Sequence, residues 1–447
     1  MRWLQLAVLY YLRFWARLKL NIIRPDIIGI TGSAGKTSCV QAIVAILGDS
    51  FRVKVSEKAN SESGIPLNIL GLTPNDYSVV DWLRLIFLAP IKALTNWEKY
   101  DIYLVELGID SPRVPKNMEY LLTIVQPKVG VFLNALGVHS DNFDSLINQT
   151  KAEEREAAVR KLIGEEKGKL IQSLPEDGVA VLNADDVNVM AFSAKTKANV
   201  TTFGFSKKST VRVIGYKVVI SGTQFRFSYA DQAIEAQFPA MALPKHYGYT
   251  LAAALATGLT YDINFDEGVL RLVKYFRLPK GRMSLLPAIN GATILDSSYN
   301  ASMEPMLDAL DLLQVIAPKR KLALLGDMRE LGKEAKFAHE VVIKKAIEVG
   351  DELYLVGPLI KEFGLSVINK DSNIRRTVRW FANAAEAAEA IKNELRKDDV
   401  LMVKGSQNTI FLEYAVEKLM RNPEEAEKLL CRRGEFWKKQ RQASGLI

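Results

Sequence analysis

The sequence is poor in the residues that build disulfide frameworks and zinc sites. It holds 2 cysteines and 3 histidines among 447 residues. Cys39 and Cys431 are too few for a disulfide-stapled fold or a four-cysteine zinc site, and this usage is typical of a reducing compartment. His139, His246 and His339 lie far apart in the chain, so their spacing alone does not predict a metal site.

The sequence also lacks internal repeats, low-complexity segments and runs of lysine interleaved with aromatic residues. The first two absences exclude a repeat array, and the third removes the pattern that would indicate nucleic acid, so no nucleic-acid partner is expected. The formal charge of +8 and a pI near 9.1 suit an anionic small substrate or a membrane surface equally well. Length and a hydrophobic content of 48% predict two or three globular domains.

Residues 29–38, GITGSAGKTS, follow a short apolar run and are the most informative stretch of the chain. The pattern predicts a strand that enters a phosphate-binding loop, in which glycines let backbone N–H groups approach an oxyanion. Lys36 would neutralise the phosphate, and the Thr37 hydroxyl would hold Mg²⁺, so ATP is the expected ligand. The residues predicted to bind the nucleotide here are Gly32, Ser33, Ala34, Gly35, Lys36, Thr37 and Ser38.

The N-terminal segment 3–23 is mostly apolar, but Arg13 and Arg17 interrupt it and it has no small-residue cleavage site. A signal peptide is therefore not predicted, and a membrane-spanning helix is disfavoured. On a helix, Arg2, Arg13, Arg17 and Arg24 fall into one stripe. Two structures share this pattern: a helix lying in a membrane interface, or a helix docked on the protein's own core with its arginines in solvent.

From Pro25 onward, strand-like apolar runs alternate with helical patterns, which is typical of an α/β fold with parallel sheets. Predicted strands include 102–105, 129–133, 179–182, 321–325, 353–356 and 400–403. Residues 196–238 are richer in alternating, half-exposed β patterns, and a proline and glycine cluster at 278–281 marks a boundary. We expect an N-terminal amphipathic helix (1–24), a central P-loop ATPase-like parallel-sheet domain (25–280) and a C-terminal Rossmann-like α/β domain (281–447).

Glu106 directly follows the predicted strand 102–105. Its carboxylate is therefore expected at the carboxyl edge of the sheet, where open α/β sheets bind ligands, and it is a natural ligand for Mg²⁺. His139 follows another predicted strand, 129–133, although an isolated histidine is more often structural.

Seven motifs occur in order: GITGSAGKTS at 29–38, VELG at 105–108, KGKL at 167–170 leading into LPEDG at 174–178, NADD at 183–186, DSSYNA at 296–301, LGDMRELG at 325–332 and KGS at 404–406. Together they resemble the Mur ligase family, the ATP-dependent amide-forming enzymes of peptidoglycan precursor synthesis. Within the family, the pattern is most similar to the ligases that add D-alanyl-D-alanine to a muramyl tripeptide.

The resemblance implies a mechanism in which a substrate carboxylate attacks the γ-phosphate of ATP and the resulting acyl phosphate reacts with an amine. The residues that it implies are Lys36, Glu106, His139, Lys167 and Arg282 for catalysis; Thr37, Glu106, His139 and Lys167 for Mg²⁺; His246, Arg282 and Asp296 for the nucleotide; and Tyr299, Asn300, Lys404 and Ser406 for the substrate. For Lys404 and Ser406 an ordinary turn between a strand and a helix is the alternative interpretation.

The resemblance also implies a carbamylated lysine that supplies a further oxygen to the metal. Lys167 has the better flanking pattern and Lys151 is the alternative. Their separation turns a straight helix by about 160°, so only one of them could face the phosphates. A solvated helix lysine is the other interpretation for either residue.

Two departures from the family pattern concern the ends of the substrate. Gln407 stands where an arginine is common in the family. The phosphate-binding loop begins at residue 29, which leaves no room for the domain that binds the UDP-sugar. We expect a cytoplasmic monomer at the inner membrane face through residues 1–24, with segment 79–97 joining that surface or packed in the core. Two other functions stay open: a Mur-type or amidating ligase with a different amine or a lipid-linked acceptor, and a membrane-associated nucleotide-binding protein with degenerate catalysis.

Overall fold

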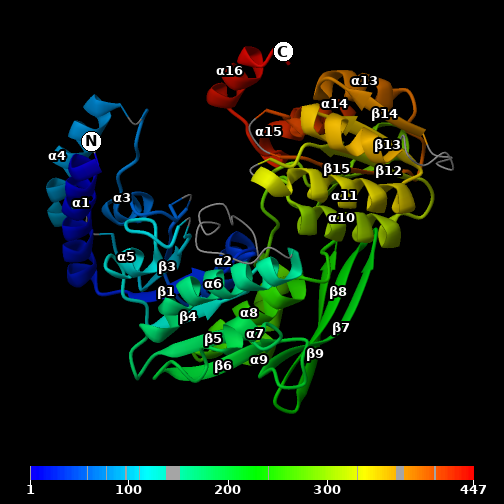
Figure 1. Ribbon diagram of the computed structural model, residues 1–447. Coiled ribbons are helices and arrows are strands. Elements are labelled where there is room, and N and C mark those ends of the chain that lie inside the picture. Colours follow the sequence, from blue (N-terminus) through cyan, green and yellow to red (C-terminus); the bar gives the residue numbers. More distant parts are fainter. Residues whose placement is uncertain are drawn as a thin grey trace. The chain divides into compact units, whose positions relative to one another are not determined.

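The computed structural model describes residues 2–57, 59–76, 78–95, 98–109, 111–136, 152–239, 241–329, 331–368, 377–406 and 409–446. The chain forms two compact units, drawn as a ribbon in Figure 1. Unit 1 comprises Met1–Gly215, Phe225–Ala236 and His246–Arg277, and unit 2 comprises Tyr216–Gln224, Gln237–Lys245 and Leu278–Ile447.

A nine-stranded sheet with the order β2-β3-β1-β4-β5-β6-β7-β8-β9 organises unit 1. Its strands are β1 (Asp26–Thr31), β2 (Val53–Val55), β3 (Ile102–Glu106), β4 (Val129–Phe132), β5 (Val179–Asn183), β6 (Asn199–Gly204), β7 (Val211–Val219), β8 (Gly222–Tyr229) and β9 (Gln232–Pro239). Neighbouring strands from β2 to β7 pair in parallel. β1 is buried from its second residue onward, as expected for a parallel strand covered on both faces.

The helices of unit 1 cover both faces of this sheet. They are α1 (Arg2–Ile23), α2 (Lys36–Leu47), α3 (Gly64–Leu70), α4 (Val79–Thr95), α5 (Met118–Leu122), α6 (Ala152–Gln172), α7 (Val187–Met190), α8 (Tyr247–Leu259) and α9 (Phe265–Tyr275). α6 packs on one face of the sheet, and α2 packs with α8 on the other. A Cβ on Gly29 of β1 would lie 2.9 Å from Pro127 and 3.1 Å from Leu170 of α6, so the glycine permits this close approach.

α1 is docked on the core of unit 1. The residues of its buried stripe are Leu9, Leu12, Ala16 and Leu20. Arg13 Nη1 donates to Thr123 Oγ1 at 3.0 Å, and Arg17 Nη1 donates to the Thr123 carbonyl at 3.3 Å. The inner face of α1 is therefore docked on the protein's own core, as one of the two predicted structures has it. Its arginines are not left to solvent alone, because Arg13 and Arg17 bind the end of α5. Among the described residues, no helix is both long and apolar enough to cross a membrane.

Unit 2 is built on a six-stranded sheet with the order β10-β11-β15-β12-β13-β14. Its strands are β10 (Ser284–Pro287), β11 (Thr293–Asp296), β12 (Lys321–Gly326), β13 (Glu352–Val356), β14 (Thr377–Phe381) and β15 (Val400–Lys404). Its helices are α10 (Met303–Ile316), α11 (Ala335–Val349), α12 (Leu365–Ile368), α13 (Ala384–Lys392), α14 (Leu412–Leu419), α15 (Ala426–Leu429) and α16 (Glu435–Ala443). α10 and α11 cover one face and α13 and α14 the other. Among the described residues of this sheet, β10 pairs antiparallel with β11 and the other neighbouring strands pair in parallel. The predicted α/β class is confirmed.

Replacing Leu12 by Ala should lower the free energy of unfolding by about 2–4 kcal/mol, because this fully buried side chain anchors α1 and its removal leaves a cavity. Phe14→Ala on the outer face of the same helix is the matched control and should cost less than about 1 kcal/mol. Denaturant unfolding of the full chain measures both. Equal losses in the two variants would contradict the docking of α1.

Candidate active site

β1 runs directly into the glycine loop of residues 32–35, and α2 begins at Lys36. Gly35 has a φ of +84°, and a Cβ there would lie 3.4 Å from Thr250 Oγ1, so the turn needs glycine. The first amide groups of α2 have no acceptor within the helix, which makes this helix start an anion site. Lys36 Nζ donates to the Gly32 carbonyl at 2.7 Å, which holds the ammonium group at the loop.

Asn134, which the sequence analysis did not single out, braces this loop. Its Oδ1 accepts from the amides of Ser33 and Ala34, each at 2.9 Å, and its Nδ2 donates to the Ala34 carbonyl at 3.1 Å. Ser33 Oγ also donates to the Leu136 carbonyl at 2.9 Å. The segment after β4 thus fixes the shape of the loop. Its position just beyond a predicted strand, at the same sheet edge as the loop, is the signal that could have identified it.

Glu106 ends β3 opposite Ile30 of β1, so its carboxylate leaves the sheet at the same edge as the glycine loop. The Glu106 amide donates to Ser56 Oγ at 3.0 Å, which fixes the backbone there. Burial raises the pKa of the Cys39 thiol, and the negative charge of Glu106 raises it further. β3 packs against α2, so the strand end that carries Glu106 lies beside this helix.

The oxygen donors at this edge suit Mg²⁺. The Thr37 hydroxyl and the Glu106 carboxylate belong to adjacent elements, and hard oxygen ligands are those that this ion prefers. Within the described ranges, no group of three or more His, Cys, Asp and Glu side chains is arranged to hold a metal. His139 and Lys151 lie outside the described residues, so their predicted roles stay predictions.

Lys167 is only 5% exposed, so the interpretation as a solvated helix lysine is wrong for this residue. It lies one helical turn before Leu170, whose side chain packs over Gly29 of β1. α6 crosses back from the end of β4 toward the start of β5, so Lys167 lies nearer than Leu170 to the carboxyl edge. The neighbouring Glu166 is also buried and accepts from the Met118 amide at 2.8 Å.

His246 precedes α8 directly, and its exposed ring stacks on Tyr247 with centroids 5.1 Å apart. Thr250, one turn further along α8, is the side chain that faces Gly35 of the glycine loop. The start of α8 therefore adjoins the predicted phosphate site, which places His246 at its border.

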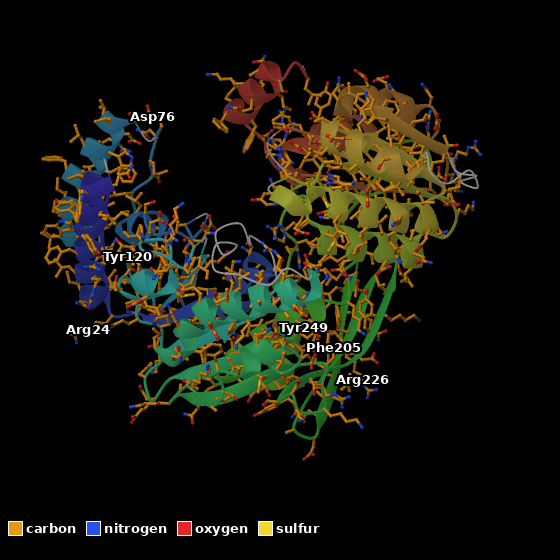
Figure 2. All side chains as sticks on the ribbon, in the orientation of Figure 1. Arg24, Asp76, Tyr120, Phe205, Arg226 and Tyr249 are labelled. Carbon is orange, nitrogen blue, oxygen red and sulfur yellow. The ribbon has the colours of Figure 1, made fainter. Side chains whose placement is uncertain are left out.

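An aromatic pair lies at the same end of α8. The rings of Phe205 and Tyr249 meet edge to face with centroids 4.9 Å apart, and Figure 2 shows the two side chains together. Asp185 accepts from the amides of Phe205 and Ser206 at 2.6 and 2.9 Å, and Asp186 accepts from the Ala135 amide at 2.8 Å. In this structure the aspartates of the NADD motif therefore hold the loops that follow β6 and β4.

In unit 2, Asp296 and Lys404 end the neighbouring parallel strands β11 and β15 and are 0% and 4% exposed. Lys404 Nζ donates to Ser297 Oγ at 3.0 Å and to the Asn300 carbonyl at 2.9 Å. Asp296 Oδ1 accepts from the Ser298 amide at 3.0 Å, whereas Oδ2 has no hydrogen-bond partner among the described residues. Burial raises the pKa of Asp296 to about 6 and lowers the pKa of Lys404 to about 7.

Arg282 lies against Tyr299, with its guanidinium carbon 4.8 Å from the ring centroid. Arg432, which the sequence analysis missed, donates to the carbonyls of Tyr299 and Ser298 at 2.7 and 2.6 Å. The same guanidinium pairs with Glu413 at 2.6 Å, with both side chains almost fully buried. Leaving one partner of such a pair alone costs about 3–5 kcal/mol, so this pair fixes the backbone beside Arg282.

Ser406 is built into a second braced loop. Its amide donates to the Asp327 carbonyl at 2.8 Å, and its Oγ accepts from the Arg329 amide at 2.9 Å. His339 Nε2 accepts from the Met328 amide at 3.0 Å, and burial lowers the pKa of this histidine, which favours the neutral ring. In this structure His339 supports the backbone of this loop, and the Ser406 hydroxyl is already hydrogen-bonded within it.

The predicted site residues thus form one group in each unit. In unit 1 the structure brings together the glycine loop, Glu106 and the start of α8, with Lys167 on the helix that covers β1. In unit 2 it brings together Arg282, Tyr299 and the segment that binds Lys404. The chemical roles of all these residues stay predictions.

The lowered pKa of Lys404 makes the stability of the chain depend on pH. Below pH 7 both the folded and the unfolded chain bind this proton, and between pH 7 and 10 only the unfolded chain does, because its lysine keeps the ordinary value of 10.5. The free energy of unfolding should therefore rise with pH across this window, and Lys404→Met should remove the rise. Denaturant unfolding at pH 7, 8 and 9 measures it, with the exposed Lys397→Met as control. The same slope in both variants would contradict the burial of a titrating Lys404.

Two family models match most of the chain. The Mur ligase middle domain matches residues 30–258, and the Mur ligase, glutamate ligase domain matches residues 281–407. A UDP-N-acetylmuramoyl-tripeptide--D-alanyl-D-alanine ligase of Mycobacterium tuberculosis is 26% identical over 400 residues, which cover 85% of this chain and 70% of that protein. The Bacillus subtilis ligase of the same name is 26% identical over 415 residues, which cover 91% and 79%.

Solved structures share the fold. The MurF ligase of Thermotoga maritima in complex with ADP superimposes with a TM-score of 0.72 at 22% identity and covers 94% of this chain and 84% of that one. MurF of Acinetobacter baumannii gives 0.72 at 19% identity, covering 92% and 80%. Since the middle-domain model alone spans more than half of the residues, the chain belongs to the Mur ligase family.

Proposed function

We propose that this chain is an ATP-dependent, ADP-forming ligase that joins D-alanyl-D-alanine to a muramyl tripeptide of peptidoglycan precursor synthesis. The observation that carries the proposal is the braced glycine loop with Lys36 at its end and Glu106 on the adjacent strand end. The relatives of similar sequence, named for D-alanyl-D-alanine addition, support the choice of amine.

The proposed reaction has two steps. A carboxylate oxygen of the tripeptide attacks the γ-phosphorus of ATP, the bond to the β-phosphate oxygen breaks, and ADP leaves. The amine of D-alanyl-D-alanine then attacks the acyl carbon, phosphate departs, and the amine loses a proton. Both steps bring oxyanions together, so positioning and charge neutralisation carry most of the catalysis.

In unit 1, Lys36 and the first amides of α2 would bind the transferring phosphate. Mg²⁺ would supply charge neutralisation at the phosphate oxygens, held by Thr37 and Glu106, and His139 would extend this set. Lys167 would contribute a carboxylate oxygen once carbamylated. The burial of Lys167 supports this role over that of a solvated helix lysine, because a buried carbamate anion needs a positive partner and the metal ion would be that partner.

Arg282 and Asp296 belong to unit 2. Arg282 would neutralise the γ-phosphate, and Asp296 would contact the nucleotide, as would His246 of unit 1. Tyr299, Asn300, Lys404 and Ser406 would line the path of the incoming dipeptide. Lys404 and Ser406 already bond to their own loops, so substrate contact by either residue requires shared or exchanged hydrogen bonds. We further propose that the chain acts as a monomer in the cytoplasm, at the inner membrane face.

Lys36→Ala should lower the rate of ADP formation by at least about 100-fold, because it removes a cation held where charge develops on the phosphate. The assay measures ADP release by the purified chain with UDP-muramyl tripeptide, with and without D-alanyl-D-alanine. Lys197→Ala, whose side chain is 79% exposed, is the control and should leave the rate unchanged. ATP binding without any amine-dependent ADP release by the unaltered chain would instead favour a nucleotide-binding protein without catalysis.

Lys167→Ala should abolish ligation, and short carboxylic acids such as acetate should restore part of the activity by supplying the missing oxygen. Lys161→Ala, an exposed lysine on the same helix, is the matched control. Activity with and without acetate measures the effect. Full activity of Lys167→Ala would transfer the proposed modification to Lys151.

A further inference from the structure

Large apolar side chains dominate the outer face of α4. Side chains spaced by three and four residues fall on one face of a helix, and on α4 the outward ones are Val80, Leu83, Phe87, Ile91 and Leu94. The opposite face is buried in the core of unit 1 through Leu85, Ala89 and Ala93. Arg84, Lys92 and Thr95 are the polar side chains that α4 exposes in whole or in part, so the helix gives little polar surface to water. Its outer face is therefore suited to contact another apolar phase.

α1 lies beside α4 and extends this surface. Tyr11 Oη of α1 donates to the Ile86 carbonyl of α4 at 3.2 Å, and the two helices stand together at one side of unit 1 in Figure 1. The outward face of α1 carries Trp3, Tyr10 and Phe14. We call the following side chains, which are between 43% and 87% exposed, the helical platform: Trp3, Tyr10, Phe14, Val80, Leu83, Phe87, Ile91 and Leu94.

The two helices that carry the platform have few acidic residues. α1 contains no acidic residue, and the single acidic residue of α4, Asp81, is buried and pairs with Arg84 at 2.7 Å. Arg17 is exposed near the C-terminal end of α1. Figure 2 shows Asp76 at the N-terminal end of α4 and Arg24 at the opposite end of the pair, after α1.

A pocket of about 460 Å³ opens at this basic end. Its polar lining residues are Arg17, Asn21, Arg24 and Gln126, and none of its lining residues is acidic. Arg17 Nη1 donates to the Thr123 carbonyl and Arg24 Nε to the Asn21 carbonyl, each at 3.3 Å, which leaves the other N–H groups of each guanidinium for an anion. Guanidinium geometry matches phosphate oxygens.

We propose that the helical platform lies flat on a bilayer that contains anionic phospholipids, with the Arg17 and Arg24 pocket on a headgroup phosphate. Aromatic side chains such as those of Trp3 and Tyr10 favour the interface between headgroups and acyl chains, and arginines beside them favour a negative surface. A second copy of the chain would present the same cationic end, so it offers no complementary charge. The proposal rests on and deepens the location at the inner membrane face proposed above, and it does not rest on the proposed ligase activity.

Sedimentation of the full chain with vesicles tests the proposal at physiological salt. Binding should be at least about tenfold stronger to 3:1 phosphatidylcholine and phosphatidylglycerol than to phosphatidylcholine alone. The double variant Leu83→Ser and Phe87→Ser should lose at least about tenfold in binding to the mixed vesicles, because it removes apolar contact area. The double variant Arg17→Gln and Arg24→Gln should bind both vesicle types equally.

Matched controls come from outside the platform. Leu270→Ser replaces a leucine of α9 that is 68% exposed, and Arg226→Gln replaces an exposed arginine of β8, labelled in Figure 2; both should bind as the unaltered chain does. Thermal unfolding verifies that each variant is folded, and if the double serine variant is not, Phe87→Ser alone decides. Equal binding of the unaltered chain to both vesicle types, or no binding, would overturn the proposal. So would a dimer in sedimentation equilibrium that dissociates on Phe87→Ser, since the platform would then cover a second copy.

Discussion

The parallel pairing of β1 with β3 on one side and β4 on the other is the constraint on which the candidate site of unit 1 depends. Ile30 of β1 lies opposite Glu106 of β3 and Val131 of β4, so three chain segments leave the sheet at one edge. A shift of one residue would turn side chains to the other face and separate the carboxylate from the loop. The burial of β1 on both faces, with Gly29 beneath α6, holds that register.

Unit 2 uses the same edge of its own sheet in a different way. In unit 1 the start of a helix and one lysine offer positive charge to a ligand, whereas in unit 2 the charged groups Asp296 and Lys404 are themselves buried at neighbouring strand ends. Burial brings the pKa of each toward neutrality, to about 6 and about 7. The Arg432 and Glu413 pair keeps the adjoining backbone in place, so these groups are held in a fixed polar setting.

Local patterns in the sequence were sufficient for the α/β class, for the strands and for the glycine loop, because each depends on residues that are neighbours in the chain. Glu106 was within reach because its position depends only on where one strand ends. The roles of Asn134 and Arg432 could not be predicted, because each residue binds a partner about a hundred residues or more away in the chain. Sequence spacing carries no signal for such contacts. The burial of Lys167 likewise depends on how α6 lies across the sheet, and its charged neighbours in sequence suggested the opposite.

The hydrogen bonds between Asn134 and the glycine loop affect how the loop would bind a nucleotide. A loop whose amides are already ordered loses little conformational freedom when a ligand arrives, so affinity there depends on contacts rather than on induced ordering. The Asn134 side chain joins the loop to the end of β4, so a movement of that strand end would change the shape of the predicted phosphate site directly. The loop and residues 134–136 are therefore joined by hydrogen bonds, through which a displacement of either would act on the other.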